Sequence, residues 1–329
     1  MDAIKFGLFL VPDDIATAQR LARQAESDGF YSVSHNDHFY SPLGTPESPQ
    51  LECFTALTAI AAVTEKVRLV PAVVAASFRT PALLAKTATS LDVASGGRFV
   101  CGLGTGWQGP EYEAHGYPFP PIEQRLEELE ETIQILKAMW TQASPAFSGK
   151  HFTVKNAYNN PRPVQKPHPP IMIGGSAPAI LEITARHADI ANIIPPTRNN
   201  HDFINDHSQA TRFTMERMQQ RIALLRELTE KAGRDPADIE LSGLVMFALS
   251  EDKDDPELRQ IAANVGYADY AAAQAAPVML VGTPDEVKRE IERRQQRTGL
   301  SYYIGFAPNE RSYELLVRKV IPAFHQGTA

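Results

Sequence analysis

The chain has 329 residues and a formal charge of −7, with 32 lysines and arginines against 39 aspartates and glutamates. This acidic balance argues against nucleic acid as the main partner, because phosphate binding needs a basic face. Hydrophobic residues make up 43% of the chain and charged residues 22%, which is typical of a soluble globular protein with a sizeable core. Although 329 residues exceed an average domain, an α/β barrel can fill such a length alone, so we expect a single domain over residues 1–329.

Signals for export, membrane insertion and disulfide bonding are weak. The N-terminus lacks the basic start and apolar stretch of a signal peptide, and no apolar segment approaches the roughly 18 to 20 residues that cross a bilayer. Cys53 and Cys101 stand in unrelated contexts, so neither a disulfide framework nor a CxxC site is indicated. The sequence therefore predicts a cytoplasmic protein with no membrane partner.

Strand and helix patterns alternate along the chain. Short apolar runs rich in β-branched residues predict strands near residues 4–11, 31–34, 67–75, 99–103, 171–173, 189–194, 240–249 and 301–306. Helical spacing predicts helices that end near Gly29 and then span 52–63, 81–94, 121–140, 179–187, 211–233, 255–296 and 312–324. Each of the eight strands precedes a helix, so we predict a (β/α)8 barrel of the TIM type, with a doubly wound sheet as the second choice.

Two segments interrupt this alternation. Residues 147–154 read as a hairpin insertion, followed by a stretch at 161–170 that five prolines force to be extended. Residues 195–210 are polar and long enough for a lid or binding loop. We expect insertions in the barrel near residues 141–165 and 195–235.

The loops that follow the strands carry the candidate chemistry, because these loops converge on one mouth of a barrel. The motifs concerned are His35–His38, Ala72–Ser77, Gly102–Trp107 and Gly174–Ala177. The glycines of Gly102–Trp107 indicate either a close ligand or a tight turn. In Gly174–Ala177, free backbone N–H groups suit an anion, while Ser176 could equally cap a helix.

Acid–base and metal chemistry have different support. His38 can exchange a proton near neutral pH and Asp37 can accept hydrogen bonds from a ligand, although such a pair is also common on protein surfaces. His35 with His38, or the group His201, Asp202, Asp206 and His207, could be written as metal ligands. Neither set has the spacing of a known metal motif, so we expect no metal and keep a metal-dependent barrel hydrolase only as a minor alternative.

Taken together, the motifs resemble the bacterial luciferase-like flavin and deazaflavin oxidoreductase superfamily. The segments that carry the resemblance are DHF at 37–39, FRTPALLAKTATSLDVASGGRFVCGLGTGW at 78–107, RLEELEETIQILKAMW at 125–140, FSGKHF at 147–152, RPVQKPHPPIMIGGSAPAILEITARHADIAN at 162–192 and VGTPDEVKREIERRQQRTGLSYYIGF at 281–306. Their order and spacing cover most of the chain, with the weakest part at about 195–275.

The resemblance implies a TIM barrel that binds FMN or the deazaflavin coenzyme F420 across its mouth. It implies His38 as the catalytic residue, and a non-prolyl cis peptide between Ala72 and Val73 behind the ring. The cofactor-binding residues that it implies are Asp37, Ala72, Val73, Gly104, Thr105, Gly106, Gly174, Gly175, Ser176 and Ala177, the last four at the phosphate. A homodimer is usual in the family.

The choice between the two cofactors favours F420 at this point. The Asp37–His38 pair and the glycine motifs are more similar to the F420 branch, although Trp107 replaces the acidic proton donor of its sugar-phosphate dehydrogenases. The sequence therefore predicts hydride transfer between reduced F420 and a small organic substrate. An FMNH2-dependent monooxygenase is the main alternative, and a noncatalytic flavin-binding protein is a minor one.

Overall fold

The computed structural model describes residues 3–42, 45–197 and 207–325. The first half of the chain forms β1 (Lys5–Phe9), α1 (Ile15–Ser27), β2 (Ser32–His35), α2 (Cys53–Ala61), β3 (Arg68–Pro71), β4 (Val74–Ala75), α3 (Pro81–Ala94), β5 (Cys101–Gly104), α4 (Gly109–Ala114), α5 (Ile122–Thr141), β6 (Ala146–Ser148) and β7 (Thr153–Lys155). The second half forms β8 (Ile171–Gly174), α6 (Pro178–His187), β9 (Ile190–Asn192), α7 (His207–Arg212), α8 (Met215–Lys231), β10 (Glu240–Leu249), α9 (Pro256–Asn264), α10 (Tyr270–Ala275), β11 (Met279–Gly282), α11 (Pro284–Thr298), β12 (Tyr302–Phe306), α12 (Glu310–Leu315) and α13 (Ile321–His325).

The main sheet is parallel and curls into a barrel. Its strand order is β3-β2-β1-β12-β10-β9-β8-β5-β4, and a parallel bridge between Leu69 and Phe99 joins the two ends. Because β3 and β4 are two parts of one stretch, 68–75, the ring contains the eight strands that the sequence predicts. The (β/α)8 barrel is confirmed, and the open doubly wound sheet is wrong because the ring closes.

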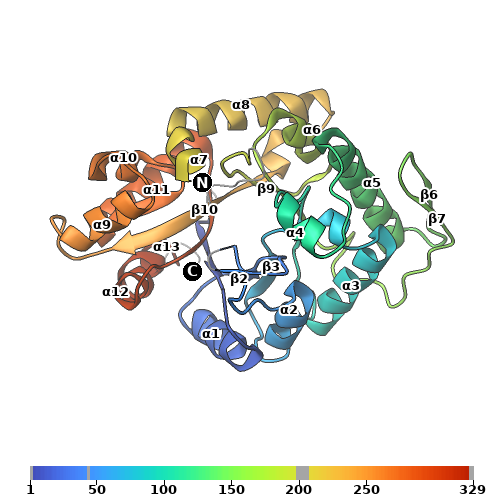
Figure 1. Cartoon of the computed structure of the whole chain (residues 1–329), viewed down its shortest axis with the longest axis horizontal. Coiled ribbons are helices and arrows are strands. Elements are labelled where there is room, and N and C mark those ends of the chain that lie inside the picture. The colour runs from blue at the N-terminus through green and yellow to red at the C-terminus, as the bar shows by residue number, and fades with distance from the viewer. Residues whose placement is uncertain (1–2, 43–44, 198–206, 326–329) are drawn as a thin grey trace.

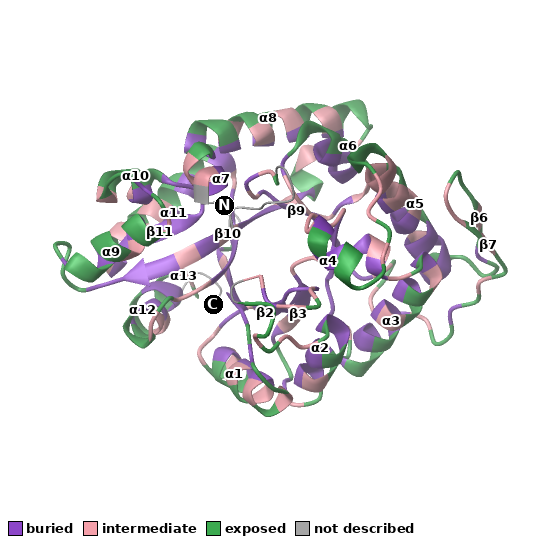
Figure 2. Cartoon of the chain, viewed as in Figure 1, coloured by how far each residue is buried: buried purple, intermediate pink, exposed green. Residues whose placement is uncertain are grey.

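Helices surround the strands, and the β6–β7 hairpin stands outside this ring beyond α5 (Figure 1). The helices turn their apolar faces inward, as Ala18, Ala22 and Ala25 on α1 do (Figure 2). Inside the barrel, bulky side chains fill the axis; they are Phe9, Val70, Val100, Met172, Ile190, Tyr302 and Ile304. This packed interior closes the barrel below its mouth, which leaves the mouth as the place for a ligand.

One predicted helix is wrong. Residues 255–296 do not form continuous helical material, because β11 (Met279–Gly282) interrupts them and pairs with Met246–Leu249 at the end of β10. A run of four apolar residues beside an alanine-rich helix is too short for periodicity to distinguish a strand from a helix. The turn signal lies just after it, where Thr283 and Glu286 form the capping box that starts α11.

Several smaller features of the chain also bear on the predictions. The hairpin at 147–154 is confirmed as β6 and β7, whereas the helix predicted over 211–233 is divided into α7 and α8, with Thr214 capping α8. The central part of the polar loop at 195–210, residues 198–206, lies outside the described residues. In the described ranges, no helix has both the length and the apolar character needed to cross a bilayer.

Candidate active site

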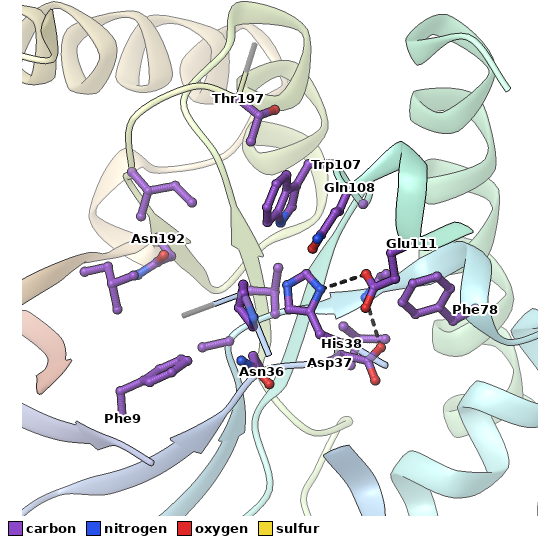
Figure 3. Close-up of a pocket in the computed structure, with 18 of the residues that line it drawn as sticks. Phe9, Asn36, Asp37, His38, Phe78, Trp107, Gln108, Glu111, Asn192 and Thr197 are labelled. Carbon is purple, nitrogen blue, oxygen red and sulfur yellow. Dashed lines mark hydrogen bonds and ion pairs between the residues drawn. The ribbon is translucent and has the colours of Figure 1, made fainter. Parts of the chain in front are cut away.

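A cavity lies at the carboxyl ends of the barrel strands (Figure 3). It is lined by Phe9, Asn36, Asp37, His38, Pro42, Ala72, Val73, Val74, Ala75, Phe78, Gly106, Trp107, Gln108, Glu111, Tyr112, Asn192, Ile194, Thr197, Leu244 and Ile304. These residues come from at least six different strands or the loops that follow them. The structure thus brings together the predicted residues Asp37, His38, Ala72, Val73 and Gly106 around one hollow.

His38 is held in place by a buried carboxylate. Its Nδ1 lies 2.8 Å from Oε2 of Glu111, whose side chain is only 1% exposed. The opposite edge of the imidazole faces the cavity, and the indole of Trp107 meets the ring edge-on at a centroid distance of 5.6 Å (Figure 3). Because an ionised carboxylate only accepts hydrogen bonds, Nδ1–H is the donor, which leaves Nε2 free for a ligand in the cavity.

Glu111 is itself fixed by the chain around His38. Its Oε1 accepts hydrogen bonds from the backbone N–H groups of Phe39, at 2.5 Å, and Tyr40, at 3.4 Å. These donors offset the cost of burying a carboxylate, and they lock the loop after β2 onto α4. Glu111 is a site residue that the sequence did not predict. Its position in the first turn of a short helix just after the glycine motif was the available signal.

Asp37 has its carboxylate oxygens occupied by protein groups. Arg79 donates to both oxygens, at 2.7 and 2.9 Å, and the backbone N–H of Ala75 donates to Oδ2 at 3.1 Å. Burial acts to lower the pKa of Arg79, but hydrogen bonding and charge pairing with Asp37, and then with Glu52, outweigh it and raise that pKa. Asp37 therefore anchors β4 to the loop after β2 while one side of the residue lines the cavity.

The peptide between Ala72 and Val73 is cis, as the resemblance implies. The side chain of Val73 packs over two predicted glycines, since a Cβ added to Gly104 or Gly174 would lie 2.8 or 3.1 Å from a Val73 methyl. Neither glycine is among the described residues that line the cavity. Their lack of a side chain instead leaves the room that Val73 needs at the cavity wall.

Gly106 and Thr105 differ in their placement. Gly106 lines the cavity with a φ of +72°, and an added Cβ there would lie 1.9 Å from the Tyr112 hydroxyl oxygen. Tyr112 shares a 2.8 Å hydrogen bond with Ser77, and burial raises its pKa to about 12. Thr105 faces a separate small hollow next to Arg125. Of this pair, the structure brings only Gly106 to the main cavity.

The segment Gly174–Ala177 lies behind the cavity wall and is bonded to it. Gly175 N–H donates to the carbonyl of Asn192 at 3.0 Å, and the Ser176 hydroxyl donates to the carbonyl of Ile194 at 2.6 Å. The N-cap of α6 is Ala177, with no side-chain cap, so Ser176 does not cap this helix. The start of α6 therefore lies beside two residues that line the cavity, Asn192 and Ile194. In the described part of the chain, no side chain accepts a hydrogen bond from the N–H groups of its first turn.

Two buried polar atoms at the cavity lack a hydrogen-bond partner among the described residues. They are Nδ2 of Asn36, a donor, and Oε1 of Gln108, an acceptor. The other end of the Asn36 amide accepts from Gln50 at 2.7 Å, so its orientation is fixed. Buried polar groups without partners are costly in an apolar setting, and here they fit the polar edge of a heteroaromatic ring system. The apolar Phe9 and Val73 and the indole of Trp107 complement its flat faces.

The proposed metal ligands do not form a cluster in the described part of the chain. His35 is buried, with Nδ1 near the carbonyl of Leu10 and Nε2 near that of Leu51, at 3.0 and 3.1 Å. No group of three or more potential metal ligands occurs among the described residues. His201, Asp202 and Asp206 lie outside the described residues, as does the side chain of His207.

Parts of the chain are similar in sequence to characterised monooxygenases. An FMNH(2)-dependent dimethylsulfone monooxygenase of Pseudomonas putida is 33% identical over 176 residues, which are 54% of this chain and 48% of that protein. The pyrimidine monooxygenase RutA of Acinetobacter baylyi is 37% identical over 142 residues, 42% of this chain and 37% of its own length. These matches thus span about half or less of the curated relatives.

The fold and the family are supported over more of the chain. The coenzyme F420 dependent tetrahydromethanopterin reductase from Methanopyrus kandleri superposes with a TM-score of 0.74 at 22% identity, covering 98% of this chain and 100% of that one. At this identity the similarity concerns the fold alone. The sequence model of the family described as luciferase-like monooxygenase matches residues 4–301. The chain therefore belongs to the luciferase-like monooxygenase family.

Proposed function

We propose that the protein is a monooxygenase that binds reduced FMN in the cavity at the barrel mouth and oxygenates a small organic molecule. The observation that carries the proposal is the His38–Glu111 pair, with Nε2 of His38 facing a cavity walled by Val73 and Trp107. FMN is preferred to F420 because the curated relatives matched at 33% and 37% identity include an enzyme named as FMNH(2)-dependent and a pyrimidine monooxygenase.

Each part of the cavity has a role in this proposal. Val73, which packs against Gly104 and Gly174, would form an apolar wall for one face of the flavin ring. Asn36 would offer a hydrogen-bond donor, and Gln108 an acceptor, to the polar edge of the ring. The segment Gly174–Ala177 would hold the phosphate at the uncapped start of α6, through backbone N–H groups other than that of Gly175, which already donates to the carbonyl of Asn192. When bound there, reduced FMN would supply the two electrons needed for one atom of dioxygen to enter the substrate and the other to leave as water.

His38 is the proton carrier of the site. Nε2 can give a proton to, or take one from, a group in the cavity, while Glu111 stabilises the imidazolium that forms when the ring holds both protons. The carboxylate also fixes the tautomer and the ring orientation, since its own oxygens are held by the backbone of Phe39 and Tyr40. Trp107, packed against the imidazole edge, limits access of water to that face.

Hydride transfer with coenzyme F420 is the second candidate. It is favoured by the Asp37–His38 pair and the two glycine motifs, and it would use the same cavity and the same histidine. The two candidates differ in the ring that the cavity prefers and in whether an oxygen atom enters the product. A direct comparison of the two cofactors is therefore the first experiment.

The protein is titrated with reduced FMN and, separately, with reduced F420 under anaerobic conditions. We expect FMN to quench the tryptophan fluorescence at lower concentrations than F420 does. The chain has two tryptophans, of which Trp107 lines the cavity and Trp140 is buried in α5 with its indole N–H on the carbonyl of Ala85. The variant Trp107→Phe should lose most of the quenching, while Trp140→Phe should keep it. Quenching by F420 without any by FMN would favour the second candidate, and no response to either cofactor would contradict both.

A further inference from the structure

A second hollow lies beside the first, between the chain after β9 and the helices α7 and α8. It is lined by Pro196, Thr197, Gln209, Arg212, Phe213, Arg217, Gln220 and Arg221. Among the described residues, its lining holds three guanidinium groups and no carboxylate, in a protein whose net charge is −7. Such a local excess of positive charge marks the hollow as different from the surface around it.

The side chains of the three arginines have no ion-pair or hydrogen-bond partner among residues 3–42, 45–197 and 207–325. Arg217 and Arg221 are four residues apart on α8, where like charges repel and weaken a helix, and Arg212 at the end of α7 adds a third. Elsewhere on α8, Lys231 is paired with Glu227 at 2.6 Å. Among the described residues, the arginine charges next to the mouth have no acidic partner, whereas Lys231 at the other end of the same helix has one.

The hollow at the opposite end of the barrel provides an internal comparison. It also contains cations, Lys5 and Arg226, but Asp189, Asp238 and Glu240 share its lining. Lys5 is paired there with Glu240 at 2.8 Å, and Arg226 donates to the carbonyl of Thr298 at 2.7 Å. That hollow carries both cations and anions, whereas the described lining of the arginine hollow carries cations alone.

Thr197 connects the arginine hollow with the active-site cavity, because it lines both. Figure 3 shows it on the loop above Trp107, at the side of the cavity away from Phe9. A molecule whose reacting part lies at His38 could therefore extend past Thr197 toward the guanidinium groups. Planar guanidinium groups bind oxyanions through paired hydrogen bonds, more strongly than neutral donors do.

We propose that the hollow formed by Arg212, Arg217 and Arg221 binds the anionic group, a carboxylate, sulfonate or phosphate, of the substrate that reacts at His38. This inference rests on the proposed function, in which the single phosphate of FMN is held at Gly174–Ala177. The arginines are then the site for the other anion. The substrate class is a small organic acid long enough to reach from the imidazole past Thr197.

The test uses inorganic phosphate as the probe and the FMN-saturated protein, in which the cofactor's own phosphate site is filled. Phosphorus NMR should show line broadening that saturates with one phosphate per chain. The double variant Arg212→Gln/Arg221→Gln should weaken this binding at least about tenfold, since two charge-assisted contacts are lost. The matched control Arg20→Gln/Arg23→Gln, which removes two exposed charges from α1, should leave it unchanged.

A second titration distinguishes arginines that bind the substrate from arginines that bind the phosphate of FMN. The affinities for FMN and for riboflavin should both be unchanged in Arg212→Gln/Arg221→Gln. The inference is overturned if the variant binds phosphate as well as the wild type, or if it loses affinity for FMN but not for riboflavin, since the arginines would then hold the cofactor. If the wild type binds no flavin but still binds phosphate through these arginines, the proposed function fails and the anion site stands.

Discussion

Replacing Glu111 by glutamine is expected to lower substrate-dependent turnover by about 100-fold, the typical size of a lost positioning carboxylate beside a general acid–base. The amide NH2 would face Nδ1 of His38 at the 2.8 Å contact, so Nδ1 would become the acceptor and Nε2 would carry the proton. Flavin affinity should change little, because the amide oxygen can still accept from the backbone N–H of Phe39. The turnover number and the flavin dissociation constant are the two measurements.

The tautomer provides a readout that a merely structural role would not move. When the imidazole is neutral and carries a single proton, nitrogen NMR should show that proton on Nδ1 in the wild type. In Glu111→Gln it should show the proton on Nε2. Glu113→Gln is the matched control, since Glu113 lies exposed on the same helix two residues away. Equal turnover in Glu111→Gln and Glu113→Gln would show that the pair has no part in the reaction.

Replacing Asp37 by asparagine is expected to lower the free energy of unfolding by about 3 kcal/mol, as for other buried pairs that lose one partner. The carboxylate is 5% exposed and receives two hydrogen bonds from Arg79 and one from the Ala75 backbone. The asparagine would turn a donor toward at least one of these donors and leave Arg79 with Glu52 as its remaining charge partner. Chemical denaturation followed by circular dichroism measures the change.

Glu52→Gln is the control for the Asp37 variant, because Glu52 pairs with the same arginine but its side chain is 47% exposed. Exposed ion pairs contribute roughly 0 to 1 kcal/mol, so its effect on unfolding should be small. The sequence prediction that Asp37 binds the cofactor gives the opposite pattern. Unchanged stability in Asp37→Asn with a large loss of flavin affinity would support direct cofactor binding and contradict the anchoring role.

The barrel was predictable from sequence because each of its eight strands is a short apolar run between clear turn signals. Parallel strands also end on the same side, so the convergence of His38, Val73 and Gly106 followed from the fold class alone. The extra strand Met279–Gly282 was missed, because it lies outside the strand–helix alternation and its apolar run is too short to be distinguished from helix by periodicity.

The partners of the predicted residues were not predictable in the same way. Glu111 lies 73 positions from His38, and Arg79 lies 42 from Asp37, so no local pattern relates either pair. The glycines show a second limit of prediction from sequence. Sequence indicates where the chain lacks a side chain, but it does not show that the side chain of Val73 occupies the space beside Gly104 and Gly174. Loop packing decides this, and the sequence does not report it.

A crystal structure of the protein with FMN bound would test the central claim, that the loops after several strands form one flavin site with His38 at its reactive face. We expect the ring against Val73, Nε2 of His38 directed at the ring or at the space above it, and the phosphate at Ser176 and Ala177. An FMN molecule bound outside the cavity, or one inside it with His38 turned away from both ring and substrate space, would contradict the account.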